Sequence, residues 1–198
     1  MNNIEEIRRF VYGRLEHWRK EPNEHIVRAD LAKLRRGVGK RPGELPELWS
    51  LLFLEFPEEL MSQNGEPTWA EWAVSGALTL YALHQQGSPR EVNMHRPGQG
   101  LGLAMAQLAG KDEDRLKAVQ RRFNAFATAR DMPECMHHLR GLVQLLRSQE
   151  IPLDYVKLAE DLYNFQDKDQ AANVRLRWGQ DFYRNQFRIE EGKDENND

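Results

Sequence analysis

Basic side chains gather in one short stretch of the chain, between residues 28 and 41. The stretch holds six basic residues and one acid, Asp30, so its local charge is +5 in a chain whose formal net charge is −3. Guanidinium groups bind phosphate oxygens through two parallel hydrogen bonds, and lysine adds a compact positive charge. Such an excess favours a polyanion over a small metabolite as the ligand. The six basic residues are Arg28, Lys33, Arg35, Arg36, Lys40 and Arg41.

A second basic set lies between residues 115 and 147, where seven basic residues accompany only two acids. Arg115 and Arg122 are seven residues apart, as are Arg140 and Arg147, so each pair shares one face of a helix. Two antiparallel helices could therefore present one positive stripe. A solvated helix surface is the simpler interpretation of such charges, but solvated faces usually mix both signs. The scarcity of acids therefore favours a binding surface.

Motifs that would indicate an enzyme do not fit. The Gly-Val-Gly-Lys run at 37–40 is followed by Arg41, where a Walker loop requires Ser or Thr. Residues 98–102 lack the spacing of a dinucleotide-binding fingerprint. Cys135, His137 and His138 lie close in sequence, but no further ligand pair follows at a fitting spacing, so we expect no metal site. Without a Ser-His-Asp order or a carboxylate pair, we expect neither catalysis nor a cofactor.

The elements that position the basic residues are predicted to be helices, because apolar residues recur with a period near 3.6 almost throughout. Thr68 and Glu71 form a capping box at the start of an apolar helix, and Asp154 caps a later one. We predict an all-α fold of about eight to nine helices in two packed helical-bundle halves. The expected helices cover residues 3–20, 23–36, 46–56, 68–86, 101–108, 111–130, 133–148, 154–165 and 170–186, and the expected regions are an N-terminal bundle with a basic loop (1–110), a C-terminal bundle (111–188) and an acidic disordered tail (189–198).

Composition indicates a cytoplasmic protein. The single cysteine, Cys135, cannot form an internal disulfide and fits a reducing compartment. Charged residues interrupt the N-terminus, where a signal peptide would need an apolar run. The longest mainly apolar run, residues 72–83, is far shorter than the ~20 residues that span a bilayer. We therefore expect no contact with a membrane.

Five stretches together resemble one known family. Residues 28–39, 95–102, 121–126, 138–147 with the following 151–155, and 174–182 are similar, in this order and spacing, to the small subunit of the type I-E CRISPR surveillance complex Cascade, the CasB family. The resemblance covers nearly the whole chain. It implies a non-catalytic, all-helical protein that packs as a head-to-tail pair and contacts the large subunit and the backbone subunits that hold the guide RNA.

The resemblance also implies that the basic surface steadies the opened target DNA, especially the displaced strand. The expected partners are single-stranded and double-stranded DNA, the guide RNA ribonucleoprotein and a second copy of the chain. A helical protein–protein adaptor, whose basic patches dock an acidic partner, is the alternative. By the resemblance and by charge, we assign nucleic-acid contacts to Arg28, Lys33, Arg35, Arg36, Lys40, Arg41, Arg96, Arg121, Arg122, Arg130 and Arg140.

Overall fold

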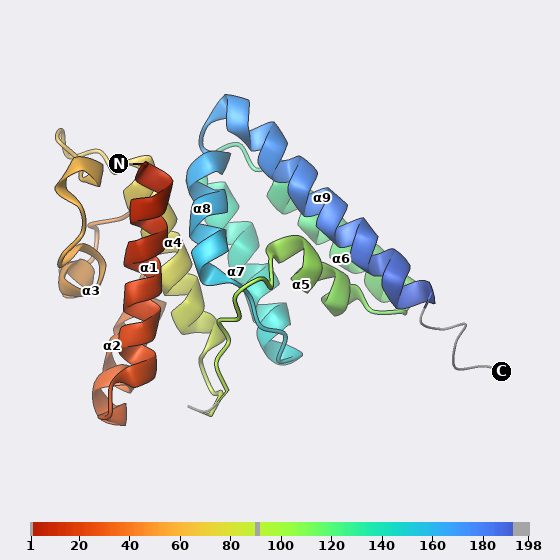
Figure 1. Cartoon of the computed structure of the whole chain (residues 1–198), viewed down its shortest axis with the longest axis horizontal. Helices are drawn as coiled ribbons and strands as arrows, with labels where there is room; N and C mark the ends of the chain where they lie inside the picture. Colours follow the sequence, from red (N-terminus) through yellow and green to blue (C-terminus); the bar gives the residue numbers. More distant parts are fainter. Residues whose placement is uncertain (1, 90–91, 192–198) are drawn as a thin grey trace.

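The fold is built from helices (Figure 1), as predicted. The structure is a computed structural model that describes residues 2–89 and 92–191. In these ranges it contains no strand, only an isolated bridge between His95 and Leu153. The α-helices are α1 (Asn3–Lys20), α2 (Glu24–Arg36), α3 (Trp49–Phe53), α4 (Trp69–His84), α5 (Leu101–Ala109), α6 (Glu113–Ala127), α7 (Met132–Ser148), α8 (Tyr155–Phe165) and α9 (Lys168–Glu191), with 3-10 turns η1 (Pro46–Leu48) and η2 (Glu58–Leu60).

Side-chain caps fix where the helices begin. The Thr68 hydroxyl accepts from the backbone N–H of Glu71, and the Glu71 carboxylate accepts from the backbone N–H of Thr68, so the capping box at the start of α4 is present. The carboxylate of Asp154 caps α8 in the same manner, by accepting from the backbone N–H of Lys157. Both caps were predicted from the sequence.

Three predicted helices differ from those observed, and one of them, expected over 170–186, is longer in the structure as α9 (Lys168–Glu191). The helix expected over 46–56 consists of η1 and a short α3, which ends at Phe53 because Leu54 is extended and Glu55 has a positive φ of 59°. Residues 111–130 form a shorter helix, α6, because Asp112 caps it at one end and Thr128 ends it at the other. As a result, Arg130 lies in the turn between α6 and α7.

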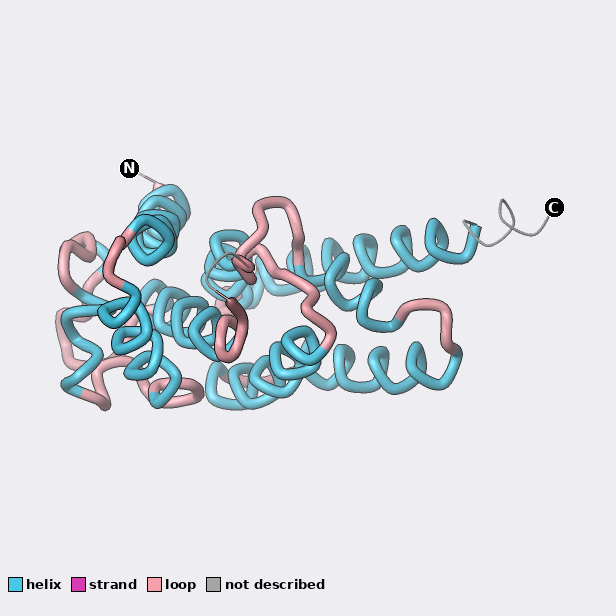
Figure 2. The backbone as a smooth tube through the Cα atoms, turned by 90° about the horizontal axis from the view of Figure 1, so that it is seen from below, coloured by secondary structure: helices cyan, strands magenta, loops and turns pink. Residues whose placement is uncertain are grey.

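Helix α4 occupies the centre of the fold. Fourteen of its sixteen residues are buried, as expected for a helix that is apolar on every side. Helices α1, α2, α7 and α8 pack around it, and α5 lies along α9. Figure 2 shows an elongated molecule, with the C-terminal part of α9 at one end.

The division of the chain near Gly110 stays a prediction. Gly110 follows α5 with a positive φ of 60°, so the chain does turn there. Side chains from both sides of this glycine nevertheless contribute to one hydrophobic core, where α8 contacts both α1 and α4. Helix α9 continues to Glu191, into the predicted tail, and residues 192–198 lie outside the described part of the chain.

Gly102 allows the backbones of α5 and α9 to approach closely. A Cβ atom at this position would meet the carbonyl oxygen of Trp178 and would lie 2.8 Å from Cβ of Asp181. We expect Gly102→Ala to lower the free energy of unfolding by about 1–3 kcal/mol, because the two helices must separate. Gly141→Ala in α7 is the control, since nothing lies within 4 Å of its Cβ. Urea unfolding would contradict this if the two variants were equally stable.

We expect the stability of the fold to depend on pH through His84. Its side chain is 0% exposed, and Nδ1 lies 2.8 Å from the hydroxyl oxygen of Tyr155. Burial and, to a lesser degree, the charge of Arg147 lower the pKa of His84 from 6.5 to about 4, and an interaction with the backbone of Ile151 opposes this shift in part. The folded state therefore favours the neutral ring, and this contribution to stability is present above pH 6.5 and lost as the pH falls toward 4.

We expect His84→Gln to reduce this pH dependence. Between pH 7 and pH 5, the native protein should lose about 2 kcal/mol more unfolding free energy than the variant does. Urea unfolding of both proteins at the two pH values measures the difference. Equal losses would show that His84 does not titrate in this way.

Candidate nucleic-acid interface

The first basic set lies on α2 and on the loop that follows it. Gly37 ends α2 against α4: a Cβ atom there would lie 2.5 Å from Leu48 and 3.1 Å from Thr79. Gly39 and Gly43 then take positive φ values of 79° and 84°, which glycine adopts without steric cost. The close packing at Gly37 therefore fixes the position of the loop that carries the next two basic residues.

Four cations of this set pair with acidic residues that lie outside the stretch 28–41, so the local charge of +5 does not include these acids. Each ion pair is at the surface, with the basic side chain about half to three-quarters exposed, and such pairs contribute little to stability. The excess of positive charge is thus smaller in space than along the sequence. The pairs are Arg28–Glu24 (3.0 Å), Arg36–Glu47 (3.0 Å), Lys40–Glu44 (2.7 Å) and Arg41–Glu66 (2.7 Å).

Arg35 has no ion pair with any described residue, and neither does Lys33. Both side chains are partly buried. Burial lowers the pKa of Arg35, and the nearby positive charge of Arg147 lowers it further. Arg147 itself contacts only neutral groups among the described residues: Nη1 donates to Oε1 of Gln86 at 2.8 Å and to the carbonyl of Leu83 at 3.5 Å. The two basic sets therefore meet at Arg35 and Arg147.

Helix α7 carries this basic surface along the fold. Met136 lies against Gly76 of α4, where a Cβ atom would be 2.9 Å from its sulfur, and it borders a small space that Lys40 also lines. Arg140 and Arg147 follow Met136 by four and eleven residues, so all three share one face of α7. This face of α7 meets the loop after α2 at one end and Arg35 at the other end. Arg140 therefore lies on the same face, between these two ends.

The remaining predicted residues lie elsewhere on the surface. All four are exposed, and none forms an ion pair with the described residues. Arg96 precedes α5, held by a backbone hydrogen bond to Leu153 at 3.2 Å. Arg121 and Arg122 are consecutive on α6 and so point about 100° apart, and Arg130 lies in the following turn. The structure thus relates Arg35, Lys40 and Arg140 through the packing of α2 and α7, whereas Arg96 precedes α5, Arg121 and Arg122 lie on α6, and Arg130 lies in the turn before α7.

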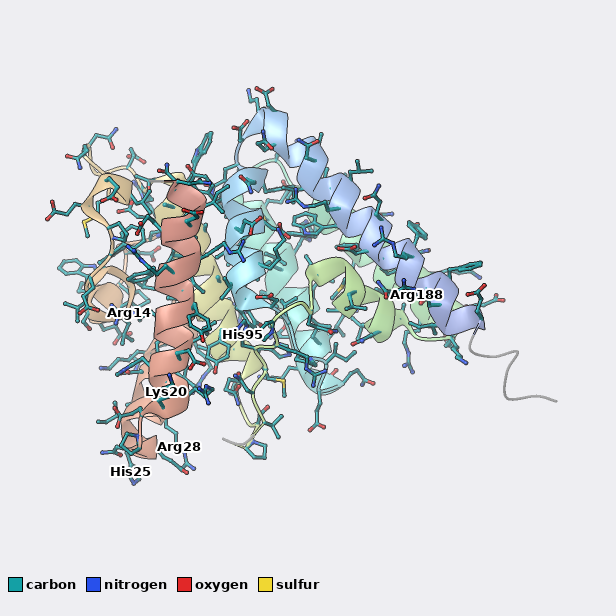
Figure 3. All side chains as sticks on the ribbon, viewed as in Figure 1. Arg14, Lys20, His25, Arg28, His95 and Arg188 are labelled. Atoms are coloured by element: carbon teal, nitrogen blue, oxygen red, sulfur yellow. The ribbon has the colours of Figure 1, made fainter. Side chains whose placement is uncertain are left out.

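Two further basic residues, Arg147 and Lys20, lie beside α2. Arg147 belongs to the charged stripe that the sequence indicates, but only its position beside Arg35 reveals its place in the surface. No pattern in the sequence singles out Lys20. Figure 3 shows it at the end of α1, near the start of α2, where Arg28 and His25 also lie. Its ion pair with Glu16, at 3.2 Å, leaves the lysine exposed.

Two features of the described residues bear on catalysis, the arrangement of the potential metal ligands and the surroundings of the single cysteine. In the ranges 2–89 and 92–191, no three His, Cys, Asp or Glu side chains are placed to hold a metal ion. Cys135 is buried, and its burial, with the charges of Asp131 and Glu134, raises the pKa of the thiol to about 12. Such a thiol is not a nucleophile at neutral pH. None of the described helices combines the length and the apolar character that crossing a membrane requires.

Comparison with known proteins gives one consistent family. A family model described as CRISPR-associated protein Cse2 matches residues 30–183. The solved structure of CasB from Thermobifida fusca is 34% identical, with a TM-score of 0.71 over 92% of this chain and 98% of that one. CasB from M. ruber is 26% identical, with a TM-score of 0.67 over 92% and 97%.

A Cse2-family protein from Thermus thermophilus shares the fold, with 24% identity and a TM-score of 0.66 over 88% of this chain and 96% of that chain. No curated protein sequence matches the chain. The family model covers well over half of the chain, and the protein from T. fusca is similar over almost all of it. The chain therefore belongs to the Cse2/CasB family of CRISPR-associated proteins, the family that its sequence resembles.

Proposed function

We propose that the chain is the non-catalytic small subunit of a type I-E CRISPR surveillance complex, Cascade. In this role it binds nucleic acid without sequence preference and stabilises the displaced DNA strand of the R-loop. Membership of the Cse2/CasB family supports the assignment to a CRISPR complex. The observation that carries the binding role is the meeting of Arg35 and Arg147, two guanidinium groups without an acidic partner among the described residues.

A modest binding energy suffices for this role. Pairing between guide and target reads the sequence, and the exchange of a DNA duplex for an RNA–DNA heteroduplex is nearly balanced in free energy. Contacts to the phosphates of the displaced strand can therefore shift the balance toward the open state. Arginine suits such contacts because it binds phosphate bidentately and stacks on unpaired bases.

The eleven assigned residues differ in how readily they can bind phosphate. Four of them must exchange a carboxylate for a phosphate when they bind, so each gains less binding free energy from the phosphate. These four are Arg28, Arg36, Lys40 and Arg41. The other seven have no ion pair within the described ranges and need no such exchange. We propose that Lys33, Arg35, Arg96, Arg121, Arg122, Arg130 and Arg140 contribute most of the affinity.

Helix α9 carries a surface of a different kind, which suits the protein partners of a subunit. Leu176, Tyr183 and Phe187 are 59–61% exposed. They are spaced by seven and four residues, so they form one apolar stripe on the helix. Exposed apolar stripes typically mark protein interfaces. We propose that this stripe contacts a neighbouring subunit, whether the large subunit, a backbone subunit or a second copy of the chain, in the cytoplasm.

Charge variants test the nucleic-acid role. Neutralising four to six phosphates of single-stranded DNA should give a log–log salt slope of about −3 to −4 for the isolated protein. Arg122→Gln should weaken binding and reduce the slope by about 0.7. Arg41→Gln should weaken it less, and Glu66→Gln should strengthen it, because it releases Arg41 from its ion pair. Fluorescence anisotropy of a labelled oligonucleotide measures all four proteins.

Absence of any salt-dependent affinity would instead favour the adaptor, whose basic patches dock an acidic protein. Circular dichroism controls for folding.

Incubation of labelled DNA with magnesium should give no cleavage, and robust cleavage would contradict the non-catalytic assignment.

Variants of α9 test the protein interface separately. We expect Tyr183→Asp with Phe187→Asp to reduce co-purification with the other Cascade subunits, because a buried carboxylate at an interface is costly. The same double variant should bind single-stranded DNA as the native protein does. Undiminished co-purification would show that the apolar stripe faces solvent in the complex.

A further inference from the structure

A cleft lies beside Arg35, between α2 and the C-terminal end of α4. Its volume is about 560 Å³, within the range of about 300–1,000 Å³ that is typical of ligand sites. Val27, Leu31 and the ring of Tyr81 form an apolar wall, and Arg28 and Arg35 line the same cleft. It therefore combines an apolar interior with positive charge.

The charges around this cleft are not balanced. Among the described residues that line it, Glu24 is the only acid, and Arg28 already pairs with it. Arg35 is partly buried and has no acidic partner in the described part of the chain. Arg147 adds a second guanidinium just outside, since it donates to Gln86, another residue of the cleft. Two neighbouring cations without a counter-ion among the described residues form a site that an anion would stabilise.

We propose that this cleft binds one unpaired nucleotide of a bound strand, with its phosphate between Arg35 and Arg147 and its base against the apolar wall. An unpaired nucleotide fits both features, because it joins a phosphate to a flat ring whose faces are apolar. A duplex does not fit, since its bases are paired and stacked. The inference rests on the proposed function and assigns one position of the displaced strand to one cleft.

The site also explains why Arg35 and Arg36, although consecutive, have different roles. Arg36 pairs with Glu47 on the outer side of α2. Arg35 points into the cleft, on the side of Tyr81 and Gln86. Arg36 therefore provides a control of the same residue type on the same helix. Arg36→Gln should alter the general attraction to phosphates but not the binding of a nucleotide in the cleft.

The test has two parts, both with the full chain. In the first, NMR follows the indole N–H of Trp18, which lines the cleft, and the side-chain amide of Gln86 during titration with millimolar thymidine 5′-monophosphate. Trp18→Phe assigns the indole signal. We expect the nucleotide to shift both signals and thymidine to shift them less. Inorganic phosphate should shift the signal of Gln86 alone. Arg35→Gln and Arg147→Gln should abolish the shifts, whereas Arg36→Gln should retain them.

In the second part, anisotropy measures binding of a short oligothymidylate at several salt concentrations. Arg35→Gln and Arg147→Gln should each lower the affinity about tenfold at low salt and reduce the salt slope by about 0.7. If the strand binds but the nucleotide leaves Trp18 unmoved, the cleft is not a nucleotide site and the proposed function stands. Equal shifts of Trp18 with inorganic phosphate would overturn the placement of the base.

If the nucleotide enters the cleft but no strand binds, the proposed function fails and the site remains. If neither binds, both are wrong. Circular dichroism of each variant separates loss of binding from loss of fold.

Discussion

The burial of α4 is the constraint on which the rest of the structure depends. This helix is apolar on every side, so it must be covered on every side, and α1, α2, α7 and α8 do so. Small residues make close cover possible: at Gly76, a side chain would collide with Met136 of α7 and approach Leu162 of α8. Since α8 contributes to the same core as α1, the two parts of the chain on either side of Gly110 are stabilised together.

The same constraint brings the basic residues together. Because α2 and α7 both cover α4, the loop after α2 comes close to Met136, and the last turns of both helices meet near Gln86. Each last turn carries arginine, Arg35 on α2 and Arg147 on α7. The negative end of each helix dipole partly offsets the repulsion between them. The positive surface thus follows from the packing around an apolar helix. Helix α4 itself contains no lysine or arginine, and His84 at its end is neutral.

This arrangement suits a protein that binds a strand without reading it. Surface ion pairs such as Arg41–Glu66 moderate the positive charge, so we expect the isolated chain to have only a weak general attraction to polyanions. In the proposed function, the cations that have no ion pair among the described residues act where the complex presents a strand to them. The apolar stripe of α9 lies on a different element, so the proposed contacts to protein and the proposed contacts to nucleic acid need not compete for the same residues.

The sequence by itself determined the helices, most of their ends and the family. Apolar periodicity and the caps at Thr68 and Asp154 are local signals, and local signals can be read along a chain. Only the tertiary structure decided which charges are neighbours. Glu66 pairs with Arg41, and Arg147 stands beside Arg35, although each partner is remote in sequence. The physical reason is that Coulomb interactions depend on distance in space, and packing around α4 sets those distances.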